Sequence, residues 1–395
     1  MKLRRIQDLD MDGKNVLLRL DLNVPMHGNE ISDDTRIQAA LPTIKYVAER
    51  AKRFAICSHL GRPKDEADLK YSLEPIGARL AEVLDKEVVF FSEYASRPTK
   101  PVLDQMTANQ FMLLENLRFH AGEKANDVEF SRKLAAGFDC YVDDAFGTVH
   151  RAHASVVGVT QNFEPAQRAA GFLIQRETEV LAKLLKSPQA PVTVVMGGAK
   201  VSDKISVILK LLDVCNNLLI GGAMAYTFLK FKGVSVGNSR VESDSFGLVE
   251  SIYAQAEKRN VRIMLPSDHI AASEFSESSP AIAVVEQDIP PGLMGLDIGP
   301  KTVDEFSRVI SASGTVFWNG PMGVFEWENF SKGSCGIAKA MADSTAETII
   351  GGGDSVSAVN QVGLADKMSH ISTGGGAALE FLEGKVLPGL RVLAY

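Results

Sequence analysis

The segment VVMGGAKVSDK, residues 194–204, joins an apolar run to a helical pattern through two glycines and two lysines. Gly197 and Gly198 let backbone N–H groups approach an anion. The positive charges of Lys200 and Lys204 and the dipole of a helix N-terminus would also attract that anion. The spacing matches neither G-x-x-x-x-G-K-[ST] nor G-x-G-x-x-G. By itself the segment fits a phosphate site or a tight turn with solvated lysines equally well.

Composition places the chain among ordinary globular proteins. Of its 395 residues 45% are hydrophobic and 23% charged, and this length predicts two domains. The net charge of −7 favours small-molecule partners over nucleic acid. Four scattered cysteines without a C-x-x-C pair are typical of a reducing compartment. The sequence has neither a leader-like N-terminus nor a membrane-spanning apolar run, so we expect a cytoplasmic protein with no membrane contact and no enzyme fused after Tyr395.

Short apolar runs alternate with amphipathic stretches along the chain. NVLLRL at 15–20, a helical pattern over 35–51 and FAICS at 54–58 begin this βαβ rhythm. Further strand candidates lie near residues 88, 111, 140, 193, 217, 262, 315 and 348, and most are apolar throughout, as buried parallel strands are. We predict an α/β fold with two doubly wound, Rossmann-like parallel sheets. Residues 171–191 are interpreted as the helix connecting them, although a surface helix of one larger domain would have the same pattern.

Cationic side chains follow four strand candidates in the first half. The motifs are RLDLNVP with Asp21 and Asn23, followed by Arg36; SHLGRP with His59 and Arg62; ENLRFH with Arg118 and His120; and DDAFGTVHRAHAS with His150, Arg151 and His153. Each residue alone is also explained as a turn former or a surface charge. Open α/β sheets bind ligands at the carboxyl ends of their strands, and arginine binds phosphate or carboxylate bidentately. The repetition therefore favours a shared anion pocket.

Three more glycine-rich turns follow strand candidates in the second half. They are NGPMGVFEWENF at 319–330, GGGDSVSA at 351–358 and STGGGAALE at 372–380. Asp354 is either a helix cap or a ligand for Mg²⁺ beside bound phosphates. Glu326 either accepts hydrogen bonds from a ribose or is a solvated loop carboxylate. Together with residues 194–204, these turns predict a nucleotide site.

The motifs together resemble those of the phosphoglycerate kinase family, in its order and approximate spacing, from Arg19 to Glu380. The resemblance implies two lobes with a cleft between them. Residues 1–171 would bind 3-phosphoglycerate, 172–187 would form the connecting helix, 188–376 would bind Mg-ATP, and 377–395 would pack back on the first lobe. It also implies a monomer that catalyses reversible phosphoryl transfer between 1,3-bisphosphoglycerate and ADP in glycolysis, with Mg²⁺ as cofactor.

The resemblance also implies roles for particular residues. Substrate contacts would be Asp21, Asn23, Arg36, His59, Leu60, Gly61, Arg62, Arg118 and Arg151. Nucleotide contacts would be Gly198, Ala199, Lys200, Lys204, Gly295, Glu326, Gly352, Gly353, Asp354 and Ser355. Arg36 and Lys200 would be catalytic, and Asp354 would bind the metal. Two departures, Val149 where the family usually has Ala and Arg176 where Lys is common, are expected to alter only affinity and closure.

The acceptor in this reaction is a carboxylate that is already deprotonated, so no general base is expected. Alignment of two anions and closure of the lobes would suffice. Two other functions are compatible with this fold class. A nicotinamide-dependent dehydrogenase would carry G-x-G-x-x-G and a following acidic residue, which are missing. A non-catalytic phosphometabolite sensor would be expected to lose Arg36, Lys200 or Asp354, and all three are present.

Overall fold

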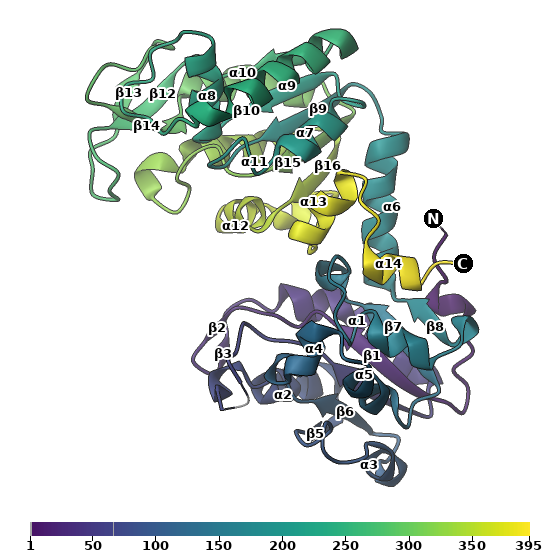
Figure 1. Ribbon diagram of the computed structural model, residues 1–395. Coiled ribbons are helices and arrows are strands. Elements are labelled where there is room, and N and C mark those ends of the chain that lie inside the picture. Colours follow the sequence, from purple (N-terminus) through teal and green to yellow (C-terminus); the bar gives the residue numbers. More distant parts are fainter. Residues whose placement is uncertain (1, 66) are drawn as a thin grey trace. The chain divides into compact units, whose positions relative to one another are not determined.

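The computed structural model describes residues 2–65 and 67–395, so Met1, with which the predicted first domain begins, lies outside the described part. The chain divides into two compact units. Unit 1 is Met1–Glu179 with Val386–Tyr395, and unit 2 is Val180–Lys385. Each contains a six-stranded sheet in which every pairing is parallel (Figure 1), which confirms the predicted α/β class. The chain passes from unit 1 to unit 2 within helix α6 (Phe172–Lys186).

The sheet of unit 1 has the strand order β5-β6-β4-β1-β7-β8. Its strands are β1 (Asn15–Leu20), β4 (Arg53–Cys57), β5 (Glu87–Phe91), β6 (Gln110–Leu114), β7 (Cys140–Asp144) and β8 (Arg168–Ala170). Its helices are α1 (Thr35–Arg50), α2 (Glu74–Leu84), α3 (Lys100–Gln105), α4 (Ala121–Ala125), α5 (Val128–Ala135) and α14 (Pro388–Val392), and β2 (Met26–His27) pairs with β3 (Glu30–Ile31). Every residue of β1 and β7 is buried, so both faces of the sheet are covered.

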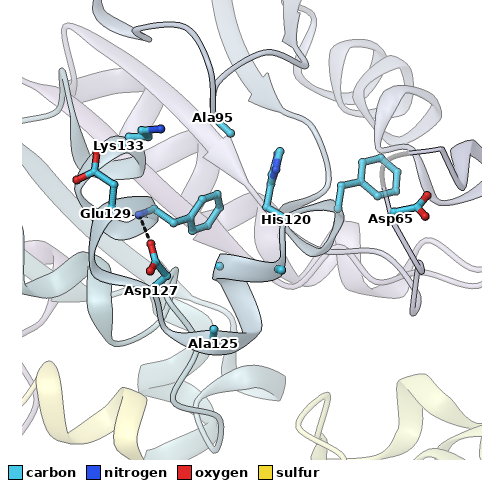
Figure 2. Close-up of a pocket in the computed structure, with 11 residues that line it drawn as sticks. Asp65, Ala95, His120, Ala125, Asp127, Glu129 and Lys133 are labelled. Atoms are coloured by element: carbon cyan, nitrogen blue, oxygen red, sulfur yellow. Dashed lines mark hydrogen bonds between the residues drawn. The ribbon is translucent and has the colours of Figure 1, made fainter.

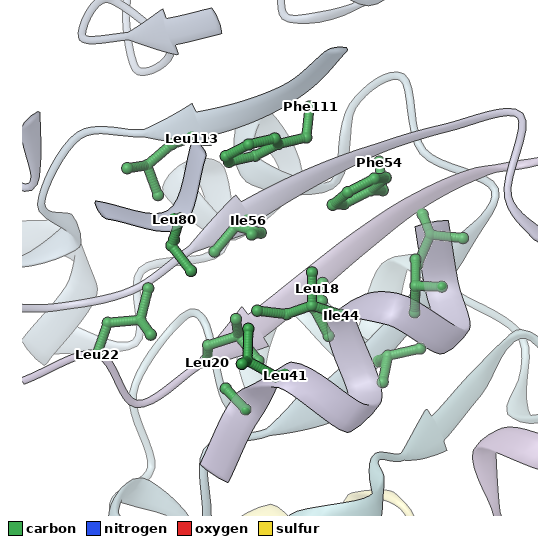
Figure 3. Close-up of a cluster of buried hydrophobic side chains, with 14 of the residues drawn as sticks. Leu18, Leu20, Leu22, Leu41, Ile44, Phe54, Ile56, Leu80, Phe111 and Leu113 are labelled. Atoms are coloured by element: carbon green, nitrogen blue, oxygen red, sulfur yellow. The ribbon is translucent and has the colours of Figure 1, made fainter. Parts of the chain in front are cut away.

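One face of this sheet packs against α1 and α2. Leu18 and Leu20 of β1 point toward Leu41 and Ile44 of α1 (Figure 3), and all four are buried. Because side chains alternate along a strand, Arg19 lies on the opposite face. The chain end also belongs to this unit, since the backbone N–H of Gly389 donates to the carbonyl of Val149 at 2.8 Å.

The sheet of unit 2 has the order β11-β10-β9-β15-β16-β17. Its strands are β9 (Val192–Met196), β10 (Asn217–Ile220), β11 (Arg262–Met264), β15 (Thr315–Asn319), β16 (Glu347–Gly351) and β17 (His370–Ile371). The helices are α7 (Ile205–Leu211), α8 (Met224–Phe231), α9 (Phe246–Arg259), α10 (Pro300–Ser311), α11 (Lys332–Asp343), α12 (Gly353–Gln361) and α13 (Gly376–Leu382). A separate antiparallel sheet of β12 (His269–Ala272), β13 (Ile282–Val284) and β14 (Met294–Ile298), in the order β13-β12-β14, was not predicted.

Both parallel sheets reverse their winding next to their first strand. In unit 1 the chain moves from β1 to β4 on one side and later adds β7 on the other. In unit 2 it moves from β9 to β10 and later adds β15 on the other side. Ligands of doubly wound sheets bind at the carboxyl ends of the strands that flank such a reversal. No helix in the described residues is long and apolar enough to cross a membrane.

Candidate active site

In unit 1 most predicted substrate residues lie just after β1, β4, β6 and β7. Arg36, in the first turn of α1, forms an ion pair with Asp21, which follows β1. Asn23 Oδ1 accepts a hydrogen bond from the N–H of Gly61 at 2.7 Å, so the loops after β1 and β4 are joined. Arg118 Nη1 donates to the carbonyl of Gly61 at 2.5 Å, which joins the loop after β6 to the same group.

Positive charge is crowded in this group. Burial, together with the neighbouring charges of Arg151 and Arg19, lowers the pKa of Arg118 to about 10. Burial also holds the pKa of His59 well below its ordinary value, with additional lowering by Arg19 and other arginines, so this imidazole is neutral near pH 7. When neighbouring positive charges lower the pKa of an arginine, an added negative charge at that place is favourable. The cluster is therefore suited to bind an anion.

Arg19, which was not among the predicted site residues, fixes the protonation of His59. It is 1% exposed, and its Nη2 lies 3.2 Å from His59 Nδ1 while its Nε donates to Ser155 Oγ at 3.0 Å. A guanidinium can only donate, so Nδ1 accepts and the proton of the neutral ring is on Nε2. His59 thus has one N–H left to donate. The sequence signal that could have identified Arg19 is its charge inside the apolar run NVLLRL.

The remaining predicted residues of unit 1 differ in their placement. Leu60 is buried, and its backbone N–H and carbonyl both bond the side chain of Asn116, at 3.2 and 2.8 Å. Arg151 Nε lies 3.2 Å from His150 Nε2. Arg62 is exposed, and the described residues offer its side chain no ion-pair partner. The structure therefore brings the arginines 36, 118 and 151 into one electrostatic cluster and leaves Arg62 at its margin.

Unit 1 also contains a cavity of about 550 Å³, whose lining is mostly acidic and apolar (Figure 2). Its carboxylates belong to Asp65, Asp127 and Glu129. Among the described residues of the lining, Lys133 is the one lysine, and there is no arginine. Asp127 caps α5 by accepting a hydrogen bond from the N–H of Phe130 at 2.7 Å. This cavity lacks the arginines that an anion site requires, so we do not assign it to the phosphorylated substrate.

In unit 2 the loops after β9 and β15 are bonded to each other. The N–H of Gly197 donates to the carbonyl of Asn319 at 2.9 Å, and that of Gly198 donates to the carbonyl of Pro321 at 2.9 Å. A Cβ at Gly197 would collide with the carbonyl oxygen of Pro321, and Gly198 has a φ of +101° that favours glycine. The two glycines are thus required by the path of the backbone.

A cavity of about 230 Å³ opens beside these loops, lined by Lys204, Asn319, Gly352, Gly353, Asp354 and Ser355 among others. Asn319 Oδ1 accepts a hydrogen bond from Lys204 Nζ, and Ser355 Oγ accepts one from the N–H of Gly320 at 2.5 Å. Burial lowers the pKa of Lys204 to about 8, while Asp354 acts in the opposite direction. Backbone and ammonium groups at this position suit phosphate oxygens.

A larger cavity, of about 450 Å³, shares Asp354 with the smaller cavity, and Gly198 also lines it. Ala199, Gly295 and Glu326 line it, together with the apolar side chains of Phe275, Met294, Leu296 and Val324. Lys200 is half-buried and belongs to the lining of neither cavity. Among the described residues, no group of three or more His, Cys, Asp or Glu is arranged to hold a metal ion.

Comparisons with known proteins show the family to which the chain belongs. The family model for phosphoglycerate kinase matches residues 6–385. The chain is 49% identical over 392 residues to the phosphoglycerate kinase of Clostridium perfringens, covering 99% of this chain and 98% of that one. The chain belongs to the phosphoglycerate kinase family. The relative from Anaeromyxobacter dehalogenans is also 49% identical, over 394 residues and 99% of both chains.

Solved phosphoglycerate kinase structures have the same fold. The structure from Coxiella burnetii matches with a TM-score of 0.87 at 39% identity, and that from Pyrococcus horikoshii with 0.83 at 32%. Each match covers 99% of this chain and 98% of the other. As a member of the phosphoglycerate kinase family, the protein is a phosphotransferase of glycolysis that acts on small-molecule substrates and uses ATP and ADP.

Proposed function

We propose that unit 1 binds 3-phosphoglycerate, that unit 2 binds the nucleotide with Mg²⁺, and that the phosphoryl group passes directly between the two ligands. The observation that carries the assignment of unit 1 is the partial burial of Arg118 beside other arginines, because a bound anion favours the charged guanidinium there. Arg36, Arg118 and Arg151 would bind the phosphate and carboxylate, with Arg62 at the margin. His59 Nε2 and the free amide of Asn23 would donate, Asp21 would accept from the substrate hydroxyl, and Leu60 and Gly61 would hold the loop through their backbone.

In unit 2 the proposed division of roles follows the two cavities. Lys204, Ser355 and the backbone at Gly198, Ala199, Gly352 and Gly353 would hold the phosphates. Glu326 would accept from the ribose hydroxyls, and the base would lie in the apolar cavity beside Gly295. Asp354 fits a Mg²⁺ ligand, since its exposed carboxylate has no hydrogen bond or ion pair within the described residues. Mg²⁺ is commonly bound by one or two carboxylates together with phosphate oxygens.

The chemistry follows from these ligands. A carboxylate oxygen of 3-phosphoglycerate attacks the γ-phosphorus of ATP, the bond from that phosphorus to the β–γ bridging oxygen breaks, and ADP leaves. The attacking carboxylate is already ionised, so no side chain has to remove a proton. Arg36 and Lys200 would neutralise charge on the transferring group. Direct transfer requires that the units bring their two ligands into line. We also propose that the protein is a monomer, because every proposed contact comes from one chain. We propose a cytoplasmic location as well.

A coupled assay tests the proposal. Purified protein is mixed with ATP, Mg²⁺ and 3-phosphoglycerate, and glyceraldehyde-3-phosphate dehydrogenase with NADH reports 1,3-bisphosphoglycerate. We expect loss of NADH only when all three additions are present, and an increased Mg²⁺ requirement for Asp354→Asn. Turnover that continues with EDTA would contradict the metal assignment. Binding of both ligands without turnover would instead indicate a sensor.

A further inference from the structure

The hydroxyl of Tyr226 lies in the wall of the larger cavity of unit 2. Tyr226 belongs to α8, is 3% exposed, and is one of the residues that line this cavity. Its oxygen lies close to Gly295, which also lines the cavity, because a Cβ at Gly295 would collide with it. The part of the chain that the structure describes provides this hydroxyl with no hydrogen bond. The oxygen is accessible from the cavity, so a ligand there can supply the hydrogen-bond partner that the protein does not.

Several polar groups near Tyr226 are engaged with other partners. The N–H of Gly295 donates to Ser239 Oγ at 2.9 Å. The Asp297 carboxylate accepts from the N–H groups of Gly333 and Ile298, at 2.6 and 2.9 Å. The ring of His269, whose Nε2 is 3.0 Å from the carbonyl of Gln287, packs against Tyr226 with a centroid separation of 5.6 Å. These contacts hold the tyrosine ring in place and leave its hydroxyl for the cavity.

Burial, with a smaller contribution from the charge of Asp297, raises the pKa of Tyr226 above its ordinary value. The hydroxyl therefore keeps its proton and can both donate and accept a hydrogen bond. Its position also limits the ligand atoms that it can meet. Asp354 and Gly198 mark the phosphate end of the cavity, whereas Tyr226 lies with Met294 and Leu296 at the apolar end.

We propose that the Tyr226 hydroxyl hydrogen-bonds the edge of the bound purine and so contributes to the choice between adenine and guanine nucleotides; this rests on the proposed nucleotide site. The apolar side chains of the cavity accept any flat base. Adenine and guanine differ at the 6-position, where one presents an amino group and the other a carbonyl oxygen. A fixed hydroxyl interacts differently with these two edges, and an edge that leaves it unpaired is disfavoured.

The test is Tyr226→Phe, which removes one oxygen and keeps the ring. Calorimetry measures the binding of ADP, GDP and tripolyphosphate to wild type and variant. We expect the Kd of ADP to rise about threefold to tenfold and the ratio of GDP to ADP affinity to change by at least about threefold. Tripolyphosphate binding should be unchanged, and the Tm of the ligand-free variant should be equal or higher. Tyr253→Phe is the matched control, because the Tyr253 hydroxyl has no hydrogen-bond partner in the described residues and Tyr253 does not line the cavity.

Failure of this inference is distinguishable from failure of the nucleotide site. Lys204→Met removes a proposed phosphate contact and should weaken ADP and tripolyphosphate alike. If Lys204→Met weakens ADP but Tyr226→Phe leaves the ADP affinity or the ADP-to-GDP ratio unchanged, the role of Tyr226 is overturned. An equal loss of tripolyphosphate affinity in Tyr226→Phe overturns it as well. If neither variant alters ADP binding, the nucleotide site itself is misplaced.

Discussion

The carboxyl edge of the sheet in unit 1 carries arginines, whereas the same edge in unit 2 carries glycines and a half-buried lysine. In unit 1 burial and the neighbouring arginine charges together lower the pKa of Arg118 to about 10. In unit 2 backbone hydrogen bonds between the loops after β9 and β15 set the shape, and Lys204 adds one charge. Recognition in unit 1 therefore depends on individual side chains, and recognition in unit 2 depends more on the path of the backbone.

Lys200 is the sharpest exception within unit 2, because its proposed role depends on side-chain charge alone. We expect Lys200→Ala to lower kcat roughly hundredfold or more, as removal of one donor to a transition-state oxyanion does elsewhere, with a much smaller rise in the KM for 3-phosphoglycerate. Steady-state kinetics checks this, with Lys210→Ala as the control because Lys210 pairs with Asp213 on the surface. A change confined to KM would remove Lys200 from the transition state.

Arg118 tests the dependence of unit 1 on single side chains. Arg118→Met should raise the KM for 3-phosphoglycerate by about tenfold to a hundredfold, because a charge-assisted hydrogen bond to a buried ligand is lost. The KM for ATP should stay within about twofold. Arg132→Met is the control, since Arg132 is exposed and pairs with Glu129. Equal losses for both substrates would show that the variant disturbs more than the proposed pocket.

The pH dependence of nucleotide binding tests the charge of Lys204. Burial lowers the pKa of Lys204 to about 8, so the free protein loses this charge as the pH rises above 8, whereas bound phosphates favour the charged form. The Kd of ADP should therefore rise about tenfold between pH 7 and pH 9. Calorimetry on Lys204→Arg should give a much flatter profile, because arginine stays charged. A wild-type profile as flat as that of the variant would contradict the role of Lys204.

Arg62 should give the smallest effect. It is exposed at the margin of the cluster, so we expect Arg62→Ala to raise the KM for 3-phosphoglycerate only about threefold, well below the effect of Arg118→Met. The same kinetic assay measures both variants. An effect of Arg62→Ala as large as that of Arg118→Met would mean that Arg62 moves into the pocket when substrate binds. No change at all would exclude Arg62 from the substrate contacts.

The sequence predicted the parallel sheets because their central strands are nearly continuous in apolar residues. Every residue of β1 and β9 is buried, and strands that are buried on both faces do not alternate between apolar and polar residues. Strands β8 and β17, of three and two residues, are too short to produce a pattern. The small antiparallel sheet was not predicted, although residues 281–285, AIAVV, form an apolar run; two of the three residues of β13 are exposed, so this run does not mark a buried strand.

The site residues could be predicted where motifs follow strand ends. They could not be predicted where contacts with residues distant in the sequence determine the position of a side chain. Lys200 and Lys204 look equivalent in the sequence, yet Lys204 is drawn to the cavity by Asn319, which is 115 residues away. Arg19 carries a visible signal as a charge in an apolar run, but its role depends on His59 and Ser155, which belong to other segments. Such partnerships are set by tertiary packing and not by local pattern.

The central claim is that unit 1 binds 3-phosphoglycerate and unit 2 binds the nucleotide, each through its own chemistry. Calorimetry on Arg118→Met and Lys204→Met, with 3-phosphoglycerate and ADP titrated separately, tests it most directly. The account predicts that Arg118→Met loses affinity for 3-phosphoglycerate and keeps that for ADP, and that Lys204→Met does the reverse. If each variant weakens both ligands equally, or if the pattern is inverted, the assignment of the two sites is contradicted.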